Sequence, residues 1–121
     1  MLLYHGTARY NLAGFLQSIA RTRRRVYVKD RRPSFATTRS FEIASLFAIR
    51  RTPIIDFPDR VGVVLEFDGE NLEVGDYEEV RDYRATLQDE HEVVVFNPQM
   101  LKLVAIWEYA NGKWYRSGDL L

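Results

Sequence analysis

The stretch EHEVVVFNPQMLKLVAIWEYANGKWYR, residues 90–116, decides the fold class of this protein. Residues 90–98 form an apolar run that Asn97-Pro98 stops, which predicts a strand. Residues 101–109 predict a second strand, which continues to residue 116 after a turn at Asn111-Gly112. An Asn-Gly pair between two aromatic-rich strands is typical of a tight hairpin. The C-terminal part of the chain therefore predicts antiparallel strands.

The rest of the chain predicts further strands and two helices. Apolar residues recur every three or four positions in residues 11–20 and 39–51, which predicts helices, and Thr38 or Ser40 would cap the second. Short apolar runs bounded by turn residues predict strands over residues 1–5, 33–38 and 60–69. Residues 21–33, 52–59 and 70–89 predict loops. This pattern is α+β, with the helices in the N-terminal half and most strands in the C-terminal half.

The composition indicates one globular domain over residues 1–121. Acidic and basic residues balance at 17 each, so no net charge attracts nucleic acid or membrane. The chain has no cysteine, and its two histidines, His5 and His91, lack metal-binding spacing, so we expect no metal. There is no membrane-spanning run and no signal peptide, so we expect a cytoplasmic site of action.

Three polar motifs interrupt this pattern. They are His5-Gly6-Thr7 at the end of the first strand, residues 34–38 where a strand leads into a helix, and Glu90-His91-Glu92 at the start of an apolar strand. Alternation along a strand would direct Glu90 and Glu92 to one face and His91 to the other. Each motif alone also fits a plain structural explanation, namely a turn, a helix cap and a solvated edge strand.

In this order, the motifs resemble the ADP-ribosyltransferase superfamily, and within it the branch of diphtheria toxin and the poly(ADP-ribose) polymerases, whose triad is His, Tyr and Glu. The resemblance covers most of the chain. It implies a split β-sandwich of two small antiparallel sheets, with NAD as co-substrate. The similar segments are LLYHGTARYNLAGFLQSIA (2–20), SFATTRSFEIASLFA (34–48), RVGVVLEFDGENL (60–72) and EHEVVVFNPQMLKLVAIWEY (90–109).

The resemblance implies a role for each motif residue. The N–H and C=O of Gly6 would pair with the nicotinamide carboxamide, His5 would bond a ribose hydroxyl on the adenosine side, and Thr7 would support either contact. Phe47 would stack on the nicotinamide ring. Glu92 would bond the 2′-hydroxyl of the nicotinamide ribose and stabilise the positive charge that develops there.

Two positions depart from the family pattern. Ser34 stands where the triad tyrosine is usual, and Phe35 would fill part of the missing aromatic wall. Glu90 completes a Glu-x-Glu pair that is typical of the arginine-modifying branch, which opens with Arg where this chain has His5. Glu90 would contact the acceptor or act as a general base.

Two further segments would contact the substrates. Tyr83, Arg84 and Gln88 lie in the region that faces the acceptor in this family. The basic arm 21–33, with Arg24 and Arg25, would neutralise the pyrophosphate or hold an anionic acceptor. The arm holds more basic residues than pyrophosphate requires, so we favour a nucleic-acid acceptor over a protein.

The sequence therefore predicts a small mono-ADP-ribosyltransferase that uses NAD, a toxin-like effector with an antitoxin or immunity protein as a possible partner. Three alternatives stay open. They are an RNA 2′-phosphotransferase-like enzyme, an NAD glycohydrolase and a catalytically inactive binding domain of the same fold.

Overall fold

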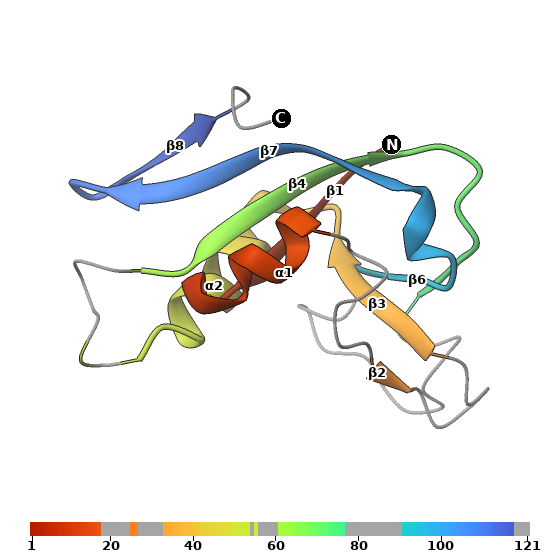
Figure 1. The fold of residues 1–121 in the computed structure, drawn as a ribbon, viewed down its shortest axis with the longest axis horizontal. Helices are drawn as coiled ribbons and strands as arrows, with labels where there is room; N and C mark the ends of the chain where they lie inside the picture. Colours follow the sequence, from red (N-terminus) through yellow and green to blue (C-terminus); the bar gives the residue numbers. More distant parts are fainter. Residues whose placement is uncertain (18–24, 27–32, 54, 56–60, 77–90, 118–121) are drawn as a thin grey trace.

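The computed structural model describes residues 1–17, 25–26, 33–53, 55, 61–76 and 91–117 of the chain. Strands dominate, and the α-helices lie in the N-terminal half (Figure 1). The strands are β1 (Leu2–Thr7), β2 (Arg25–Val26), β3 (Pro33–Thr38), β4 (Val63–Gly69), β5 (Val74–Asp76), β6 (Glu92–Val95), β7 (Leu101–Ala110) and β8 (Lys113–Ser117). The helices are α1 (Leu12–Gln17) and α2 (Phe41–Arg50), with 3₁₀ turns at Arg9–Asn11 and Pro98–Met100.

The strands form an antiparallel sheet in the order β5-β6-β3-β1-β4-β7-β8, and β2 pairs with the outer part of β3. Strand β4 is buried along nearly its whole length because β1 and β7 flank it and both of its faces are covered. The β7–β8 connection is the Asn111-Gly112 turn, whose φ angles are 53° and 76°. Two positive φ angles are typical of a type I′ turn, which confirms the predicted hairpin.

The centre of the sheet is unevenly paired. β1 pairs with β4 along all of its residues, from Leu2 opposite Asp68 to Thr7 opposite Val63. On its other edge, β1 pairs with β3 at Tyr4 opposite Thr38. Beyond that pair the two strands diverge, so β3 and β2 extend away from the long β4 and β7 strands (Figure 1). The residues that follow Tyr4 in β1 therefore lie where the sheet splays open.

The two faces of the sheet are covered differently. Odd-numbered residues of β1 lie on one face, where Leu3 belongs to a large apolar cluster with Phe15 of α1 and with residues of β3, β4 and β6. Even-numbered residues lie on the face that α2 covers, where Tyr4 packs in a second cluster with Ala44 and Ala48. This division follows from the alternation of side chains along a strand.

Local sequence explains why α2 forms and where it packs. Ser40 is its N-cap, and the Ser40 hydroxyl accepts a hydrogen bond from the Ile43 N–H at 3.2 Å. The small residues Ala44 and Ala48 let the helix approach β1 closely. A Cβ atom built on Gly6 would lie 1.9 Å from the Ala44 carbonyl oxygen, so only glycine fits at residue 6.

The structure confirms the α+β class, the antiparallel strands, the helix at 39–51 and the strand at 33–38. It corrects the end of the first strand, because His5, Gly6 and Thr7 all pair with β4 and do not form a turn. It also corrects part of the predicted loop 70–89. Val74–Asp76 form β5, which pairs with β6, although three residues around a glycine carry no strand pattern.

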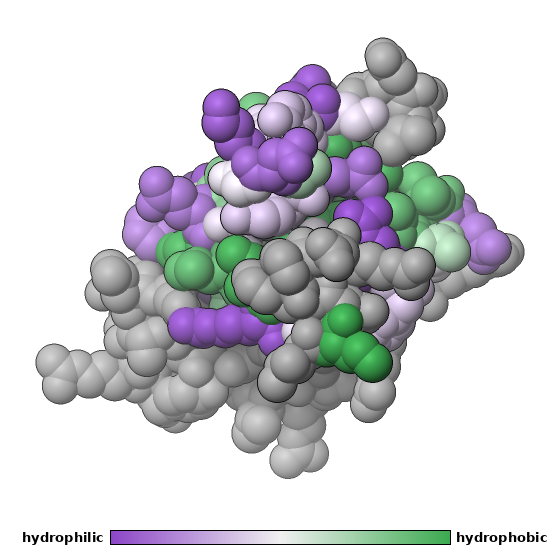
Figure 2. All heavy atoms as spheres, turned by 90° about the vertical axis from the view of Figure 1, so that its left-hand side faces the viewer, coloured by the Kyte–Doolittle hydropathy of each residue, from purple (hydrophilic) through white to green (hydrophobic). Residues whose placement is uncertain are grey.

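Two more boundaries differ from the prediction. β6 begins at Glu92, and His91 lies in a 3₁₀ turn before it, so strand alternation does not extend to His91. The predicted loop at 21–33 contains β2, although the rest of it up to residue 32 lies outside the described residues. On the face drawn in Figure 2, hydrophobic residues form small areas among hydrophilic ones. No helix in the described part of the chain is long and apolar enough to cross a membrane.

Candidate functional site

The backbone of Gly6 turns its polar groups toward the splay between β1 and β3. The Gly69 N–H donates to the Met1 carbonyl oxygen at 3.2 Å, so Met1 and Gly69 form a hydrogen-bonded pair of the β1–β4 ladder. Such pairs alternate along an antiparallel ladder, and each residue directs its N–H and C=O to the same edge. Gly6, five residues later in an unbroken register, therefore directs its N–H and C=O away from β4 and toward β3.

The Gly6 carbonyl oxygen accepts a hydrogen bond from Nη1 of Arg51, the residue that follows α2. The guanidinium carbon of Arg51 also lies 5.3 Å from the centre of the Phe47 ring, which is within the range of a cation–π contact. Phe47 and Arg51 are one helical turn apart, which brings both side chains to the same side of α2. Gly6, Phe47 and Arg51 thus meet where the end of α2 passes β1.

His5 lies on the opposite face of β1 from α2. Its Nδ1 lies 2.7 Å from the Ala36 carbonyl oxygen of β3. A carbonyl oxygen can only accept, so Nδ1 carries the proton, and Nε2 is the acceptor nitrogen whenever the ring is neutral. The ring packs against Phe35 and Phe15, with ring centres 4.5 and 5.5 Å away. His5 thus bridges the two strands across the splay.

Glu92 shares the face of Gly6 and α2. It is the first residue of β6 and lies opposite Thr38 of β3, which in turn lies opposite Tyr4 of β1. Directly opposed residues of neighbouring strands direct their side chains to the same face. Glu92 is half-buried, and its Oε2 atom is buried. The structure therefore brings Glu92 to the face of Gly6 and Phe47, whereas the His5 side chain lies on the other face.

The remaining described residues of the predicted site are buried. Ser34 is 0% exposed and Phe35 is 3% exposed, so both lie beneath the surface of β3. Thr7 is 2% exposed, and its hydroxyl accepts a hydrogen bond from Nδ2 of Asn11 at 3.0 Å. These three side chains support the strands around the site, and none of them presents an exposed surface to a ligand in solution.

The substrate-facing candidates lie mostly outside the described residues. Arg24, Tyr83, Arg84, Gln88 and Glu90 are all in that group, and Arg25 is described by its place in β2, opposite Ser34. The described part of the chain contains no group of three or more acidic or histidine residues that could hold a metal ion.

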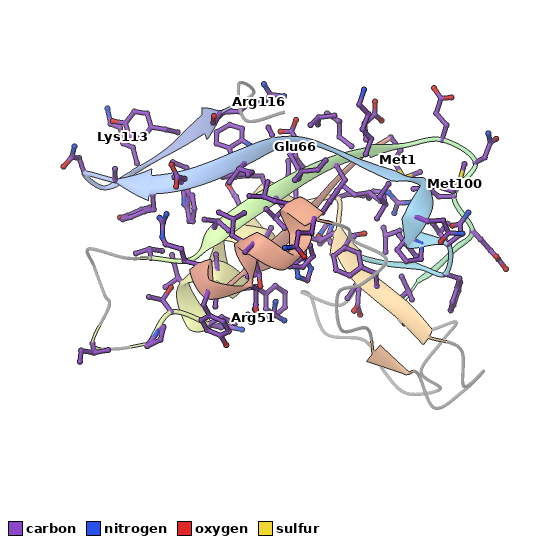
Figure 3. All side chains as sticks on the ribbon, in the orientation of Figure 1. Met1, Arg51, Glu66, Met100, Lys113 and Arg116 are labelled. Atoms are coloured by element: carbon purple, nitrogen blue, oxygen red, sulfur yellow. The ribbon has the colours of Figure 1, made fainter. Side chains whose placement is uncertain are left out.

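Sequence reasoning did not select Arg51. Its signal in the sequence was weak because it is one of two adjacent arginines at the end of a helix, where a basic residue is common. The sequence does show that Arg51 follows Phe47 by four residues, which places both on one side of a helix. The contact between Arg51 and Gly6, however, depends on how α2 packs on β1. Arg51 lies at the end of α2, far from Glu66 (Figure 3).

Glu66, which was not predicted as a site residue, lies inside the apolar run of β4 and is 4% exposed. Its carboxylate accepts hydrogen bonds from Nε1 of Trp107 at 3.0 Å and from Nη2 of Arg116 at 2.8 Å. The hydrogen bond from Arg116 lowers the pKa of Glu66 below its ordinary value, although burial opposes this shift. A charged residue in the run VVLEF was the signal that a partner is required.

Burial raises the pKa of Tyr4, and the negative charge of Glu66 raises it further. The Tyr4 ring also packs edge-on against Phe41 of α2, with ring centres 5.7 Å apart. Tyr4 thus lies between Glu66, its partner in β4, and Phe41 at the N-terminal end of α2.

Comparison with protein-family models, with curated proteins and with solved structures finds no match to this chain.

Proposed function

We propose that the protein is a mono-ADP-ribosyltransferase that uses NAD and has an ADP-ribosyltransferase-like fold. The observation that carries the proposal is the polar edge at Gly6. A carboxamide offers one donor and one acceptor side by side, and the N–H and C=O of Gly6 offer the complementary pair at the splay. Phe47 supplies an aromatic face next to that edge, and Glu92 supplies a carboxylate on the same face of the sheet.

The chemistry assigns Glu92 the central role. The bond between the nicotinamide nitrogen and C1′ of the ribose breaks, nicotinamide leaves with the bonding electrons, and the acceptor's nucleophile forms the new bond to C1′. Positive charge develops on the ribose, and a carboxylate bonded to its 2′-hydroxyl stabilises that charge. The nucleophile's proton passes to a base, for which Glu90 is the candidate by sequence.

The other residues receive supporting roles in this proposal. His5 would bond a ribose hydroxyl through Nε2 from the other face of β1, across the gap between β1 and β3, since Nδ1–H donates to the Ala36 carbonyl. Ser34, Phe35 and Thr7 are buried, so they would position the strands and not touch NAD. The acceptor would be a nucleic acid in preference to a protein, because of the basic arm at 21–33. A toxin-like effector of this kind would have an antitoxin or immunity protein as its partner.

The test is to incubate the protein with NAD labelled in its adenosine part, together with total RNA, DNA or cell lysate. We expect label on one acceptor and an equal amount of released nicotinamide. Nicotinamide without transfer would instead indicate an NAD glycohydrolase. Removal of phosphate from a 2′-phosphorylated RNA would indicate the phosphotransferase alternative, and no reaction of NAD in any mixture would refute the proposal.

The matched pair of variants is Glu92→Gln and Glu70→Gln. Glu70 is exposed just after β4 and serves as the control. We expect Glu92→Gln to lower the rate of nicotinamide release by about 10²–10³-fold, the size of effect seen when one group that stabilises transition-state charge is removed. The Glu70→Gln variant should keep the wild-type rate. Equal rates in the two variants would exclude Glu92 from catalysis.

A further inference from the structure

The contacts of Arg51 point to a role that the proposed function does not include. We propose that the Arg51 guanidinium occupies the nicotinamide position of the site, and that nicotinamide must displace it in order to bind. This inference rests on the proposed function. It assigns to Arg51 control over how strongly the site binds the nicotinamide part of NAD.

The position of the guanidinium follows from two contacts with independent partners. Nη1 of Arg51 donates to the carbonyl oxygen of Gly6, and the guanidinium carbon lies 5.3 Å from the centre of the Phe47 ring. The Gly6 carbonyl is the acceptor that the carboxamide would use, and the Phe47 ring is the face on which the pyridine ring would stack. Two of the three proposed nicotinamide contacts, the Gly6 carbonyl and the Phe47 ring, are therefore already made by one side chain of the protein, and the third is the Gly6 N–H.

The chemistry of the two groups is similar. A guanidinium is planar, presents N–H donors at its rim and stacks on aromatic faces. A nicotinamide is also planar and presents the N–H₂ donor of its carboxamide at its rim. The nicotinamide of NAD carries a positive charge on its ring, as the guanidinium does. The same carbonyl and the same aromatic ring can therefore hold either group, but not both at once.

The placement of Arg51 lets the exchange occur without refolding. Arg51 is the C-cap of α2, with φ −86° and ψ −5°, and it is exposed. The backbone on its N-terminal side is fixed, because α2 packs on β1 through Ala44 and Ala48 with no side chain between. Displacement thus requires rotation of one long side chain toward solvent, while Gly6 and Phe47 keep their places.

The experiment measures binding of free nicotinamide and of NAD by calorimetry or NMR titration, without turnover. The variants are Arg51→Met, which keeps length but has no donor and no charge, and Arg51→Lys, which keeps the charge but not the planar group. Lys113→Met, at the distant first residue of β8, is the control for the loss of one positive charge. Thermal melts establish that each variant folds.

Nicotinamide is the more decisive probe because it is neutral, so loss of a positive charge does not by itself weaken its binding. We expect Arg51→Met to bind nicotinamide about five- to tenfold more tightly than the wild type, since it no longer competes for one hydrogen bond and one ring face. Arg51→Lys should lie between the two, and Lys113→Met should match the wild type.

Two results would overturn the inference and leave the proposed function standing. They are unchanged nicotinamide affinity in Arg51→Met, and weaker affinity, which would make Arg51 a direct ligand contact. Failure of the wild type and all variants to bind NAD or nicotinamide would overturn both the inference and the proposed function.

Discussion

Residue 6 lies where α2 comes closest to β1. A Cβ atom there would lie 1.9 Å from the Ala44 carbonyl oxygen and 2.8 Å from the Ala48 nitrogen. Both atoms belong to the helix backbone, which cannot yield as a flexible side chain can. The glycine is thus required for packing α2 on the sheet, in addition to any contact that its N–H and C=O make with a ligand.

We expect Gly6→Ala to lower the free energy of unfolding by roughly 3 kcal/mol, because α2 must shift away from β1 to admit the methyl group. Gly14→Ala is the matched control, since a Cβ at Gly14 in α1 meets nothing within 4 Å. That change should raise stability by about 0.5–1 kcal/mol through helix propensity. Urea unfolding of both variants measures the difference, and equal stabilities would contradict the packing described here.

The Glu66–Arg116 pair supports a second prediction at this scale. Arg116→Met leaves the buried carboxylate of Glu66 with the Trp107 donor alone among the contacts described above. We expect a measurable loss of stability at pH 7, smaller than the full cost of breaking a buried pair because the Arg116 side chain is 47% exposed.

The loss should depend on pH with a definite sign. The folded-state pKa of Glu66 is lowered from its ordinary value of 4.5, so the pair's contribution is complete above that pH. It is lost as the pH falls through the lowered pKa, so the wild type and Arg116→Met should converge in acid. Chemical unfolding at several pH values measures this, with Lys113→Met as the control. A difference that stays constant from pH 7 to pH 3 would contradict it.

At the scale of single residues, some residues of the candidate site could be predicted from the sequence and others could not. It selected Gly6, Phe47 and Glu92, and alternation within β3 and β6 accounts for the face of Glu92. It did not reveal Arg51, because the contact between Arg51 and Gly6 joins positions 45 residues apart through the packing of α2. Nor did it reveal that Ser34 and Thr7 are buried, since a small polar residue fits a strand interior and a strand end equally well.

Among the elements, α2 determines the geometry of the candidate site. It places Phe47 next to the Gly6 edge and ends at Arg51. Its start is fixed by Ser40, and Glu42 in the first turn and Arg50 in the last both favour the helix dipole. The start of this helix could be predicted from the sequence, because Ser40 precedes a segment in which apolar residues recur every three or four positions.

We therefore expect Ser40→Ala to cost about 1 kcal/mol of stability, the usual effect of removing an N-cap side chain. Ser45→Ala is the control within the same helix, because Ser45 is not a cap and its hydroxyl donates to the Glu42 carbonyl on an exposed side. Replacement there should change stability by less than about 0.5 kcal/mol. Thermal unfolding monitored by circular dichroism compares the two, and a larger loss for Ser45→Ala would assign the helix start elsewhere.

The short strands were the least predictable elements. β5 spans three residues around Gly75 and is held by pairing with Val93–Val95 of β6. β2 spans two residues and is held by pairing with β3. Neither contains enough residues for an alternating pattern, so their existence depends on partners far along the chain. The long strands β4 and β7 carry their own pattern and were predicted within a few residues of their ends.

For the whole molecule, the pairing pattern divides the sheet into a tightly joined part and a splayed part. β1, β4, β7 and β8 pair along most of their lengths, whereas β1 and β3 are joined at Tyr4 and Thr38. The sequence predicted the strands but not this division, because the residues of one strand do not determine over what length a neighbouring strand pairs with it. The residues of the candidate site gather at this division.

Amide hydrogen exchange tests this picture of the molecule. We expect the slowest exchange in β4, which is paired on both edges and buried on both faces, and faster exchange in β8, which is an edge strand. Exchange measured residue by residue by NMR decides the matter. Equal protection of β8 and β4 would mean that the edge of the sheet is covered in solution, for example by a second molecule.

The closeness of α2 to Gly6 has a consequence for how this chain can change over generations. Any descendant of this chain that keeps the fold must keep α2 this close to β1, so selection for folding alone would retain the glycine at 6. The steric limit at Gly6 does not apply to Glu92 or Arg51, whose side chains could change while α2 stays packed on β1. Among descendants of this chain, a glycine at position 6 would therefore mark the shared architecture, whatever stands at residues 92 and 51.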